Sequence, residues 1–491
     1  ITTGVSFEGN TVYTSEVLTK FMDLQPGQVL NSVYVGQKVQ GINAAYARDG
    51  YMLAHVDGIR VDDQGVLHVH IVEGIVEDIV PAGNKKTRDK VITREFVQKK
   101  GKPFNKFLVR RSVERVYNLG FFDDVNVRML PGDQDPNNVI IEIDVLEHKT
   151  GTITLGAGYS KSDGLMGIIE FGEDNFRGTG DKFKVHWEIG GKKKYKNYQI
   201  SYLKPWIDSK GTSLGFSFFN REDEYTDYNE DGNEVAEYNK KSRGFNISFG
   251  RQTGEYTRDY LTLESRKDSY KWDSDDSSGY RYDKNAGKGK NWNNGSYNFA
   301  NDKYVDKNFG RINSITWQKV YDSRDNIYEP TRGRRISYTA QWAGHGLGGD
   351  FDFYKFTAEA RMYKKLGAKN VLAFRARGGF IQGDAPYSQL FTLGGADSLR
   401  GYEDDQFRGK YMYNATLEFR FPIVKKVSGV LFTDIGDAWD APNVTWYNSK
   451  KTFNYGVGAG VRITTPIGPV KLDYGVGKHK NKFHFSFGTQ F

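Results

Sequence analysis

The residues of this sequence that could carry chemistry gather around Arg400, which lies in the glycine-rich segment Leu393–Tyr402. A guanidinium withdrawn from water needs carboxylate partners that fit its fork-shaped donor geometry. Downstream, Glu418 and Asp434 alternate with apolar neighbours, so each carboxylate falls on the opposite strand face from those neighbours. This set predicts a buried ion-pair site, and we find no nucleophile beside a base.

Other candidate sites lack a component that their chemistry requires. The segment Asp227–Asn233 begins like a calcium loop, but Tyr238 occupies the twelfth position, where a bidentate glutamate is needed. We therefore interpret it as an acidic solvated loop. His68 and His70 share one strand face without an evident third ligand, so no metal is expected.

The remaining histidines do not indicate an enzyme. A phospholipase in a membrane barrel needs a serine and a histidine together, and neither His345 nor His484 has an obvious local partner. No nucleotide-binding segment is apparent. We predict a protein without catalytic residues and without a cofactor.

Composition favours a membrane β-barrel over other classes. The 491 residues suggest two or more domains, and their mean hydropathy of −0.64, without an apolar run of about 18 residues, argues against membrane-spanning helices. Aromatic residues make up 14% of the chain and glycines number 56, which suits a barrel with a polar lumen, although a soluble all-β protein fits composition alone. The absence of cysteine excludes disulfides. A net charge of +8 without a concentrated basic stripe argues against nucleic acid.

The C-terminal two thirds of the chain alternates with a period of two. In the last strand, Phe483, Phe485, Phe487 and Phe491 fall on one face, and polar or small residues fall on the other. In Phe453–Arg462, as in several other segments from Gly151 onward, charges share a face with glycines while the opposite face is apolar. A soluble barrel would reverse this pattern. It therefore predicts lipid outside and a wet lumen, with about 16 strands.

Loops between the predicted strands alternate in length. Asn175–Gly180 is typical of the short turns, and long polar stretches lie near Glu222–Ser242, Lys267–Lys307 and Gly383–Lys410. We expect the short turns on the side of the N-terminal domains and the long loops on the outer side.

The first 148 residues contain two copies of one β-α-α-β-β unit. The copies open with Val5–Asn10 and Ile79–Asn84, and matching landmarks lie roughly 74 residues apart. The predicted helices lie near Ser15–Met22, Val33–Asp49, Lys90–Lys99 and Asn105–Leu119, and the closing strands are Val66–Val72 and Val139–Val145.

These repeats resemble POTRA domains, and the remainder resembles the BamA family of outer-membrane assembly factors and its superfamily. Leu399–Tyr402 matches the (V/L)RG(F/Y) motif of the sixth extracellular loop, and Phe432–Gly436 matches an F-x-D-x-G strand motif. Asp322–Asp325 with Pro330–Gly333 resembles another family segment, and Gly488–Phe491 matches a C-terminal assembly signal. The resemblance covers essentially the whole chain.

The resemblance implies POTRA domains over residues 1–74 and 75–148, followed by a transmembrane antiparallel barrel of about 16 strands over residues 149–491. The barrel would lie in the outer membrane of a diderm bacterium, with the POTRA domains in the periplasm. It would assemble and insert other β-barrel proteins. Its partners would be unfolded outer-membrane clients, lipid, and accessory lipoproteins or periplasmic chaperones. Because the chain begins at Ile1 without a signal peptide, we expect that processing or truncation removed the start.

In the family, the sixth loop folds into the lumen and its arginine docks on acids of neighbouring strands. The implied docking residues here are Leu399, Arg400, Gly401, Tyr402, Glu418 and Asp434. Clients are expected to pair at the seam between the first and last strands. The implied seam residues are Thr152, Ile153, Thr154, Leu155, Gly156, Ala157, Gly158 and Tyr159 in the first strand, and Phe483, Phe485, Phe487, Gly488 and Phe491 in the last.

Several alternatives stay open at this stage. A two-partner-secretion transporter shares the superfamily motifs but normally carries a plug helix, and a TamA-like factor normally carries three POTRA domains. A plain diffusion pore would need neither the repeats nor the loop motif. Arg400 could act as a strut without client contact, the repeats could be spacers, and the seam could be fully closed.

Overall fold

The computed structural model describes residues 2–160, 164–190, 195–228, 231–232, 234–271, 281–282, 299–300, 308–326, 329–441, 450–465, 468–478 and 480–487. The chain forms two compact units. The N-terminal unit comprises Ile1–Thr152 and Gly172–Lys182, and the barrel unit comprises Ile153–Phe171 and Phe183–Phe491. Among the described helices, none is long and apolar enough to cross a membrane.

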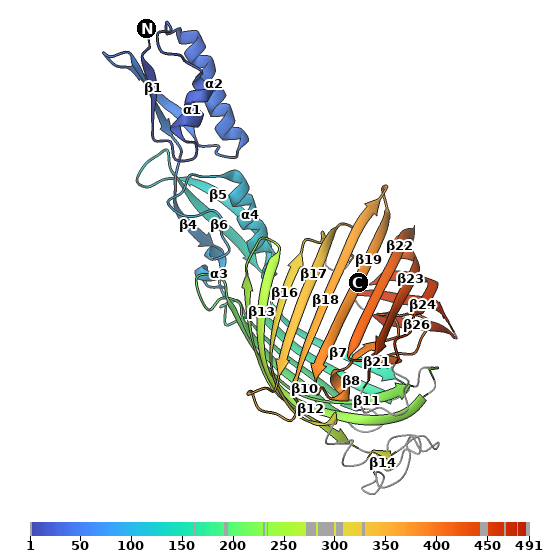
Figure 1. Ribbon diagram of the computed structural model, residues 1–491. Coiled ribbons are helices and arrows are strands. Elements are labelled where there is room, and N and C mark those ends of the chain that lie inside the picture. The colour runs from blue at the N-terminus through green and yellow to red at the C-terminus, as the bar shows by residue number, and fades with distance from the viewer. Residues whose placement is uncertain are drawn as a thin grey trace. The chain divides into compact units, whose positions relative to one another are not determined.

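The first repeat has the predicted β-α-α-β-β order. Its three strands pair in the order β1-β3-β2, with β1 parallel and β2 antiparallel to β3 (Figure 1). Two helices pack on this sheet over a core that includes Leu18, Ile42 and Tyr46. The elements are β1 (Gly4–Glu8), α1 (Ser15–Met22), α2 (Ser32–Arg48), β2 (His55–Val61) and β3 (Val66–Val72).

The second repeat has the same order, but its first helix is shorter than predicted. The prediction of a helix near Lys90–Lys99 is wrong beyond Thr93. The backbone N–H groups of Val97 and Gln98 donate to Ser112 Oγ at 2.9 and 3.2 Å, which draws the chain out of helical geometry. The elements are β4 (Val76–Ala82), α3 (Asp89–Thr93), α4 (Lys106–Tyr117), β5 (Phe122–Pro131) and β6 (Val139–Glu147), with the sheet order β4-β6-β5.

Matched residues in the two repeats make the same interactions. Asn31 and Asn105 are the N-caps of α2 and α4, and each side chain accepts hydrogen bonds from the first-turn N–H groups. Glu73 and Glu147 each accept N–H groups from the loop that follows the first strand of their own repeat. Both repeats are therefore stabilised by an asparagine N-cap and by a glutamate that binds the first loop.

The turn after β8 (Gly164–Phe176) belongs to the N-terminal unit. Asn175 Nδ2 donates to Thr87 Oγ1 at 2.8 Å in a buried contact, and the Arg88 N–H donates to the carbonyl of Gly178 at 2.9 Å. Gly178 has a φ of 71°, and a Cβ there would collide with the carbonyl of Lys86. The predicted short turn is therefore ordered, and it packs against the second repeat.

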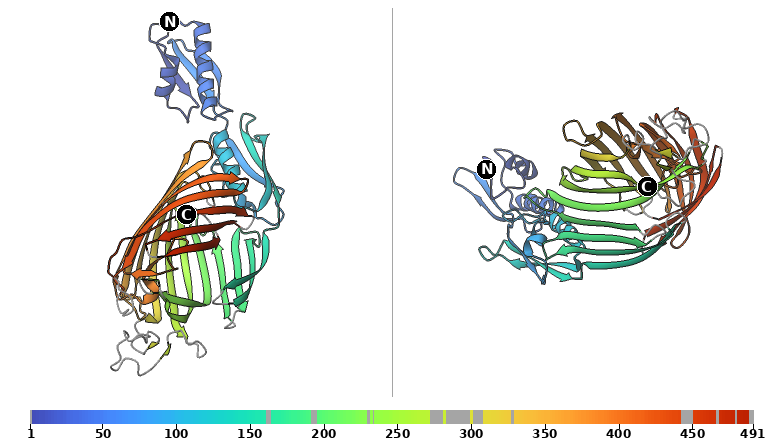
Figure 2. Two further views of the ribbon diagram at one scale, coloured as in Figure 1. Left: turned by 90° about the vertical axis from the view of Figure 1, so that its right-hand side faces the viewer. Right: turned by 90° about the horizontal axis from the view of Figure 1, so that it is seen from below.

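The barrel unit is a sheet of 16 strands, as predicted, and it curls into a wall (Figures 1 and 2). Each of these 16 strands is a neighbour of the next of the 16 along the chain, and every register given between them is antiparallel. The order runs from β26 to β7, so these two strands end the sheet. Besides β8, the strands are β7 (Gly151–Ser160), β9 (Asp181–Gly190), β10 (Tyr195–Lys204), β11 (Ser213–Tyr228), β12 (Glu234–Gln252), β13 (Thr257–Lys271), β16 (Gly310–Asp322), β17 (Gly333–Ala343), β18 (Phe353–Leu366), β19 (Asn370–Gly383), β22 (Tyr411–Val424), β23 (Val427–Trp439), β24 (Asn454–Thr465), β25 (Gly468–Gly477) and β26 (Asn481–Phe487).

The barrel faces have the polarity that the period of two predicted. On β22, Leu417 is 47% exposed while its neighbour Glu418 is 2% exposed. On β23, Leu431 is exposed and Asp434 is fully buried. Apolar side chains therefore point outward and charges inward, which is the arrangement of a barrel surrounded by lipid.

One predicted loop is wrong. Glu222–Ser242 is mostly strand, because β11 continues to Tyr228 and β12 begins at Glu234. Glu222 lies opposite Lys241 in the register, and opposite charges across a strand pair favour continued pairing. Of the segment that begins like a calcium loop, residues 229, 230 and 233 lie outside the described residues. Within the described ranges, no group of three His, Asp or Glu side chains could hold a metal ion.

Replacing Glu147 by Gln should weaken the second repeat by about 1 kcal/mol, because a carboxylate binds N–H groups more strongly than a neutral amide does. Burial raises the pKa of Glu147, but the hydrogen bonds from Thr87, Lys86 and Lys85 outweigh it and hold the pKa below its ordinary value of 4.5. This stabilisation is present above pH 4.5 and is lost as the pH falls through the lower pKa of the folded state.

Hydrogen–deuterium exchange of the amides of residues 85–87 measures the effect. Exchange should be faster in the variant at neutral pH, and the difference should shrink as the pH falls below 4.5 through the lower pKa of the folded state. Glu114→Gln, at an exposed position of α4, is the matched control. Equal protection in the variant and the wild type at neutral pH would contradict the assignment.

Candidate functional site

The loop between β19 and β22 carries the predicted motif and folds back on apolar side chains. It contains a short 3-10 helix (Tyr387–Gln389) and the hairpin β20 (Phe391–Leu393) with β21 (Phe407–Gly409). Leu393, Leu399 and Tyr402 are buried in one cluster with barrel residues such as Phe353 and Met412. Burial of these side chains is the driving force that keeps a polar, glycine-rich loop inside the wall.

Glycines give the motif its path. Gly394, Gly395 and Gly401 have φ angles of 126°, 92° and 95°, which side chains with a Cβ rarely adopt. Ser398 closes the turn, because its hydroxyl accepts the N–H of Gly394 at 2.9 Å and donates to the carbonyl of the same residue at 2.8 Å. The turn directs Arg400 at the barrel wall.

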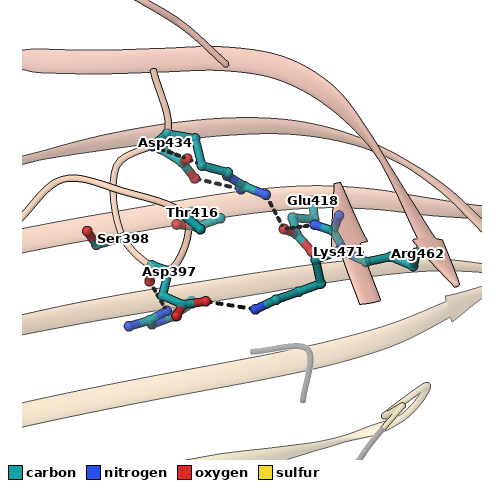
Figure 3. A pocket seen from close by; sticks show the side chains of 10 residues that line it. Asp397, Ser398, Thr416, Glu418, Asp434, Arg462 and Lys471 are labelled. Atoms are coloured by element: carbon teal, nitrogen blue, oxygen red, sulfur yellow. Dashed lines mark hydrogen bonds and ion pairs between the residues drawn. The ribbon is translucent and has the colours of Figure 1, made fainter. Parts of the chain in front are cut away.

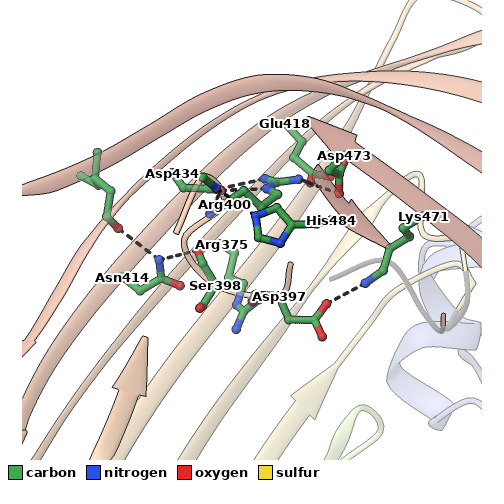
Figure 4. A network of polar contacts seen from close by, with 12 residues as sticks. Arg375, Asp397, Ser398, Arg400, Asn414, Glu418, Asp434, Lys471, Asp473 and His484 are labelled. Carbon is green, nitrogen blue, oxygen red and sulfur yellow. Dashed lines mark hydrogen bonds and ion pairs between the residues drawn. The ribbon is translucent and has the colours of Figure 1, made fainter. Parts of the chain in front are cut away.

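Arg400 meets both of the acids that the sequence singled out (Figure 4). Its Nε and Nη2 bind the two carboxylate oxygens of Asp434 at 2.7 and 2.8 Å, and its Nη1 binds Glu418 Oε1 at 2.7 Å. The backbone N–H of Arg400 also donates to Asp434 at 3.1 Å. The three side chains are at most 3% exposed, so these are buried, charge-assisted hydrogen bonds.

The ion pairs extend into a network that balances its own charge. Arg420 Nη2 lies 2.8 Å from Glu418, and Arg462 Nη1 lies 2.7 Å from Asp473, which is 3.6 Å from Arg400. Counting Arg400 and Asp434, three arginines face three acids. Such a set can be buried because each charge has an opposite charge and hydrogen bonds beside it.

The face of the guanidinium is covered as well as its edges. The Cζ of Arg400 lies 3.4 Å from the ring centroid of Phe432, the first residue of the predicted strand motif. An aromatic face attracts a cation, most strongly where water is excluded. Phe432 therefore acts with Asp434, two residues further along β23, on the same arginine.

Three glycines of β24 and β25 make room for the backbone of the motif. A Cβ on Gly456 would collide with the carbonyl of Arg400, and one on Gly475 would lie 2.5 Å from the N–H nitrogen of Gly401. A Cβ on Gly477 would lie 2.9 Å from the ring of Tyr402. Sequence reasoning placed glycines of β24 on the lumen face, but it missed that they permit this contact.

The motif also contacts the last three strands directly. The Tyr402 hydroxyl donates to the carbonyl of Tyr455 on β24 and accepts the N–H of Lys478 after β25, both at 3.0 Å. The N–H of Gly401 donates to Nε2 of His484 on β26 at 3.0 Å. Sequence reasoning missed His484 and Asp473, because nothing in their neighbourhood along the chain indicates a partner.

A cavity beside Arg400 is too small for a substrate. Its volume is about 20 Å³, enough for one water molecule. Charged and polar side chains line it, among them Asp397, Glu418, Asp434, Arg462 and Lys471 (Figure 3). The arrangement can anchor a loop, and this small cavity has no room for a reacting molecule.

The predicted seam residues lie on the two end strands of the sheet. On β7, Ile153 and Leu155 are 73% and 75% exposed, and Thr152 and Thr154 are exposed too. Gly156, Ala157, Gly158 and Tyr159 continue β7, but their side chains lie outside the described residues. On β26, Phe483 and Phe485 are exposed; Phe487 ends the strand, and Gly488 and Phe491 lie beyond the described residues.

Replacing Arg400 by Ala should release the loop at a cost of about 3–5 kcal/mol, because Glu418 and Asp434 would stay buried without their partner. Protease cleavage within residues 394–406 of the folded barrel measures the release. Arg332→Ala, in an exposed turn, is the matched control. A variant whose loop is as resistant as the wild type would refute the anchoring role.

Replacing Gly475 by Ala should displace the motif without removing a charge, because the new Cβ would overlap Gly401. We expect faster cleavage of the same loop than in Gly378→Ala, where a Cβ would have only an ordinary contact at 3.7 Å. Equal cleavage rates in the two variants would show that the glycine is not needed for close approach.

Comparison with known proteins places this geometry in a family. The family described as the Omp85 superfamily domain matches residues 175–491. The POTRA family, described as a surface antigen variable number repeat, matches residues 2–74 and 75–148.

Two curated relatives align with nearly the whole chain. The outer membrane protein assembly factor BamA of Nitratidesulfovibrio vulgaris is 25% identical, over 99% of this chain and 61% of that protein. The BamA of Neisseria meningitidis serogroup B is also 25% identical, over 99% of this chain and 66% of that protein. The chain thus spans somewhat less than two thirds of the length of these relatives.

Solved structures share the fold. BamA from Haemophilus ducreyi lacking POTRA domains 1–3 superposes with a TM-score of 0.65 at 21% identity, covering 100% of both chains. CdiB from Escherichia coli superposes with a TM-score of 0.66 at 14% identity, covering 99% of this chain and 88% of that chain. With its 16-stranded barrel, its two repeats and a family match that covers more than half of its length, the chain belongs to the Omp85 superfamily.

Proposed function

We propose that this chain assembles β-barrel proteins and inserts them into an outer membrane. The observation that carries the proposal is alignment over 99% of the chain with relatives named outer membrane protein assembly factors. The docked loop motif adds support, because it braces the strands that lead to one end of the sheet. The proposal includes no catalytic residue and no cofactor.

The mechanism we propose uses the seam between β7 and β26. An unpaired strand edge in hydrocarbon leaves N–H and C=O groups without partners, at a cost of several kcal/mol for each group. A client strand that pairs with such an edge removes this cost. Glycines in β7 weaken its pairing, since they have no side chain to pack. The free energy would come from the client's own folding, and the protein would lower the barrier.

The ion pairs and hydrogen bonds of the loop would stabilise the side of the seam that β26 forms. Arg400 and its neighbours contact β22, β23, β25 and β26, so that side of the wall is tied to one buried point. The opposite end, at β7, has no corresponding anchor among the contacts of the described residues. We infer that β7 is the side that yields when a client enters.

The domains would divide this work. We propose POTRA domains over residues 1–74 and 75–148 in the periplasm and the barrel over residues 149–491 in the outer membrane of a diderm bacterium. The outer strands of the POTRA sheets, β2 and β5 among them, offer edges to which an extended client could add. Unfolded clients and lipid would be the partners, with accessory lipoproteins or periplasmic chaperones supplying clients.

A polypeptide transporter of the same superfamily, whether of the two-partner-secretion or the TamA-like kind, is less well supported. The likeness to CdiB concerns the fold alone, at 14% identity, whereas the two aligned assembly factors are 25% identical. A plain diffusion pore is disfavoured by the buried apolar cluster that the inward loop forms with the wall.

We expect the protein in liposomes to accelerate folding of an outer-membrane barrel client at least about tenfold, a change of about 1.4 kcal/mol in the barrier. Because the chain lacks cysteine, a disulfide between one cysteine in residues 152–159 and one in residues 483–487 can be introduced cleanly. This lock should abolish the acceleration, and reductant should restore it.

The matched control is a lock between Val457→Cys on β24 and Val476→Cys on β25, which are direct neighbours away from the seam. It should leave the acceleration unchanged. Peptide flux without client folding would favour the transporter, and acceleration that survives the seam lock would refute the seam mechanism.

A further inference from the structure

The contact between the loop motif and the last strand depends on a histidine. His484 is 4% exposed, and its Nε2 accepts the N–H of Gly401 across 83 residues of sequence. Figure 4 shows its imidazole beside Arg400 and close to Asp473. The residue has no place in the ion-pair network, so the network does not explain it.

Acceptance of an N–H fixes the protonation of the ring. Nε2 must carry no proton, so the imidazole is neutral and its proton lies on Nδ1. A protonated imidazole has two N–H donors and no acceptor. Protonation would therefore set a donor against the N–H of Gly401, and the hydrogen bond would be replaced by repulsion.

The charged groups around His484 come from three elements. Arg400 and Asp404 of the loop, Asp473 of β25 and Lys482 of β26 act on it electrostatically. Asp473 is paired with Arg462, so it is not a dedicated partner for an imidazolium. Lys482, which is paired with Glu403, is a cation and would repel an imidazolium. A polar cavity of about 470 Å³ lies beside the ring, lined also by Arg375, Arg377, Asp397 and Asp405, and gives protons access.

We propose that His484 is a positioning residue that latches the loop motif to the terminal strand, and that its protonation opens the latch. In the strand order, β26 is the last strand of the sheet, and its one neighbour is β25. The hydrogen bond from Gly401 to His484 is thus a tether between the loop and this strand, beside the ion pair of Lys482 with Glu403. The latch couples the position of Arg400 to the edge strand, and it weakens in acid.

The importance of the latch for client insertion rests on the proposed function, but its existence does not. The test therefore measures the latch itself. Hydrogen–deuterium exchange of the segment 395–405 in the folded, detergent-solubilised full chain reports the Gly401 N–H, after correction for the dependence of intrinsic exchange on pH. In parallel, a difference in gel mobility between heated and unheated samples shows that each variant has a folded barrel.

The wild type should be protected at about pH 7.5 and exchange about tenfold faster at about pH 4, which is well below the ordinary histidine pKa of about 6.5. His484→Leu should exchange about tenfold faster at both pH values, because it offers no acceptor. His484→Gln should be protected at both, since its amide oxygen accepts without titrating. Ser486→Ala is the matched control, two residues along the same strand face, and should match the wild type.

Two results would overturn the proposal. Equal protection in His484→Leu and the wild type would show that the hydrogen bond does not hold the loop. The same pH response in His484→Gln as in the wild type would assign the acid sensitivity to another group. A latch confirmed by exchange in a protein that fails to accelerate client folding would refute the proposed function alone.

Discussion

The position of the inward loop depends on the neutralisation of one buried guanidinium. Arg400 is withdrawn from water, and the wall must supply carboxylates at the right distance and angle or exclude the loop altogether. Asp434 binds the guanidinium with its carboxylate, and Glu418 accepts a further hydrogen bond from it. The ring of Phe432 lies against the face of the guanidinium. Because these three residues lie on the paired strands β22 and β23, the loop is held by two neighbouring strands at once.

This electrostatic demand is met only because space and apolar contact are arranged around it. Glycines on β24 and β25 let the motif's backbone lie against the wall, where any side chain would intrude. Leu399 and Tyr402 bury apolar surface on either side of the charged residue. The motif is therefore a short segment in which charge, shape and hydrophobic burial favour the same position. Its hydrogen bond to His484 extends that position to the edge of the sheet.

The N-terminal unit is stabilised by interactions that recur in its two repeats. Each repeat is small, and each secures its first loop with a glutamate at the end of its last strand. The turn at Asn175–Gly180, which belongs to the same unit, is bound by the same loop of the second repeat through Thr87 and Arg88. One loop thus holds both its own repeat and the turn that packs on it.

The sequence by itself determined the elements, the face of each strand and the identity of the anchor. A strand rotates each side chain by half a turn, so Glu418 and Asp434 had to point away from their apolar neighbours, and no tertiary information was needed. The same logic made the 74-residue repeat visible. Local patterns failed where a distant group competes for the backbone, as Ser112 does at Val97, or where charges pair across strands, as between Glu222 and Lys241.

Only the tertiary structure decided which residues meet. The partner of Gly401 is His484, the third acid of the network is Asp473, and the glycines at 456 and 475 face one loop, all across long stretches of chain. Hydrogen bonds and close approaches act over a few ångströms, and sequence separation carries no record of them. The strand order and the register bring these groups together, and both are set by the whole sheet.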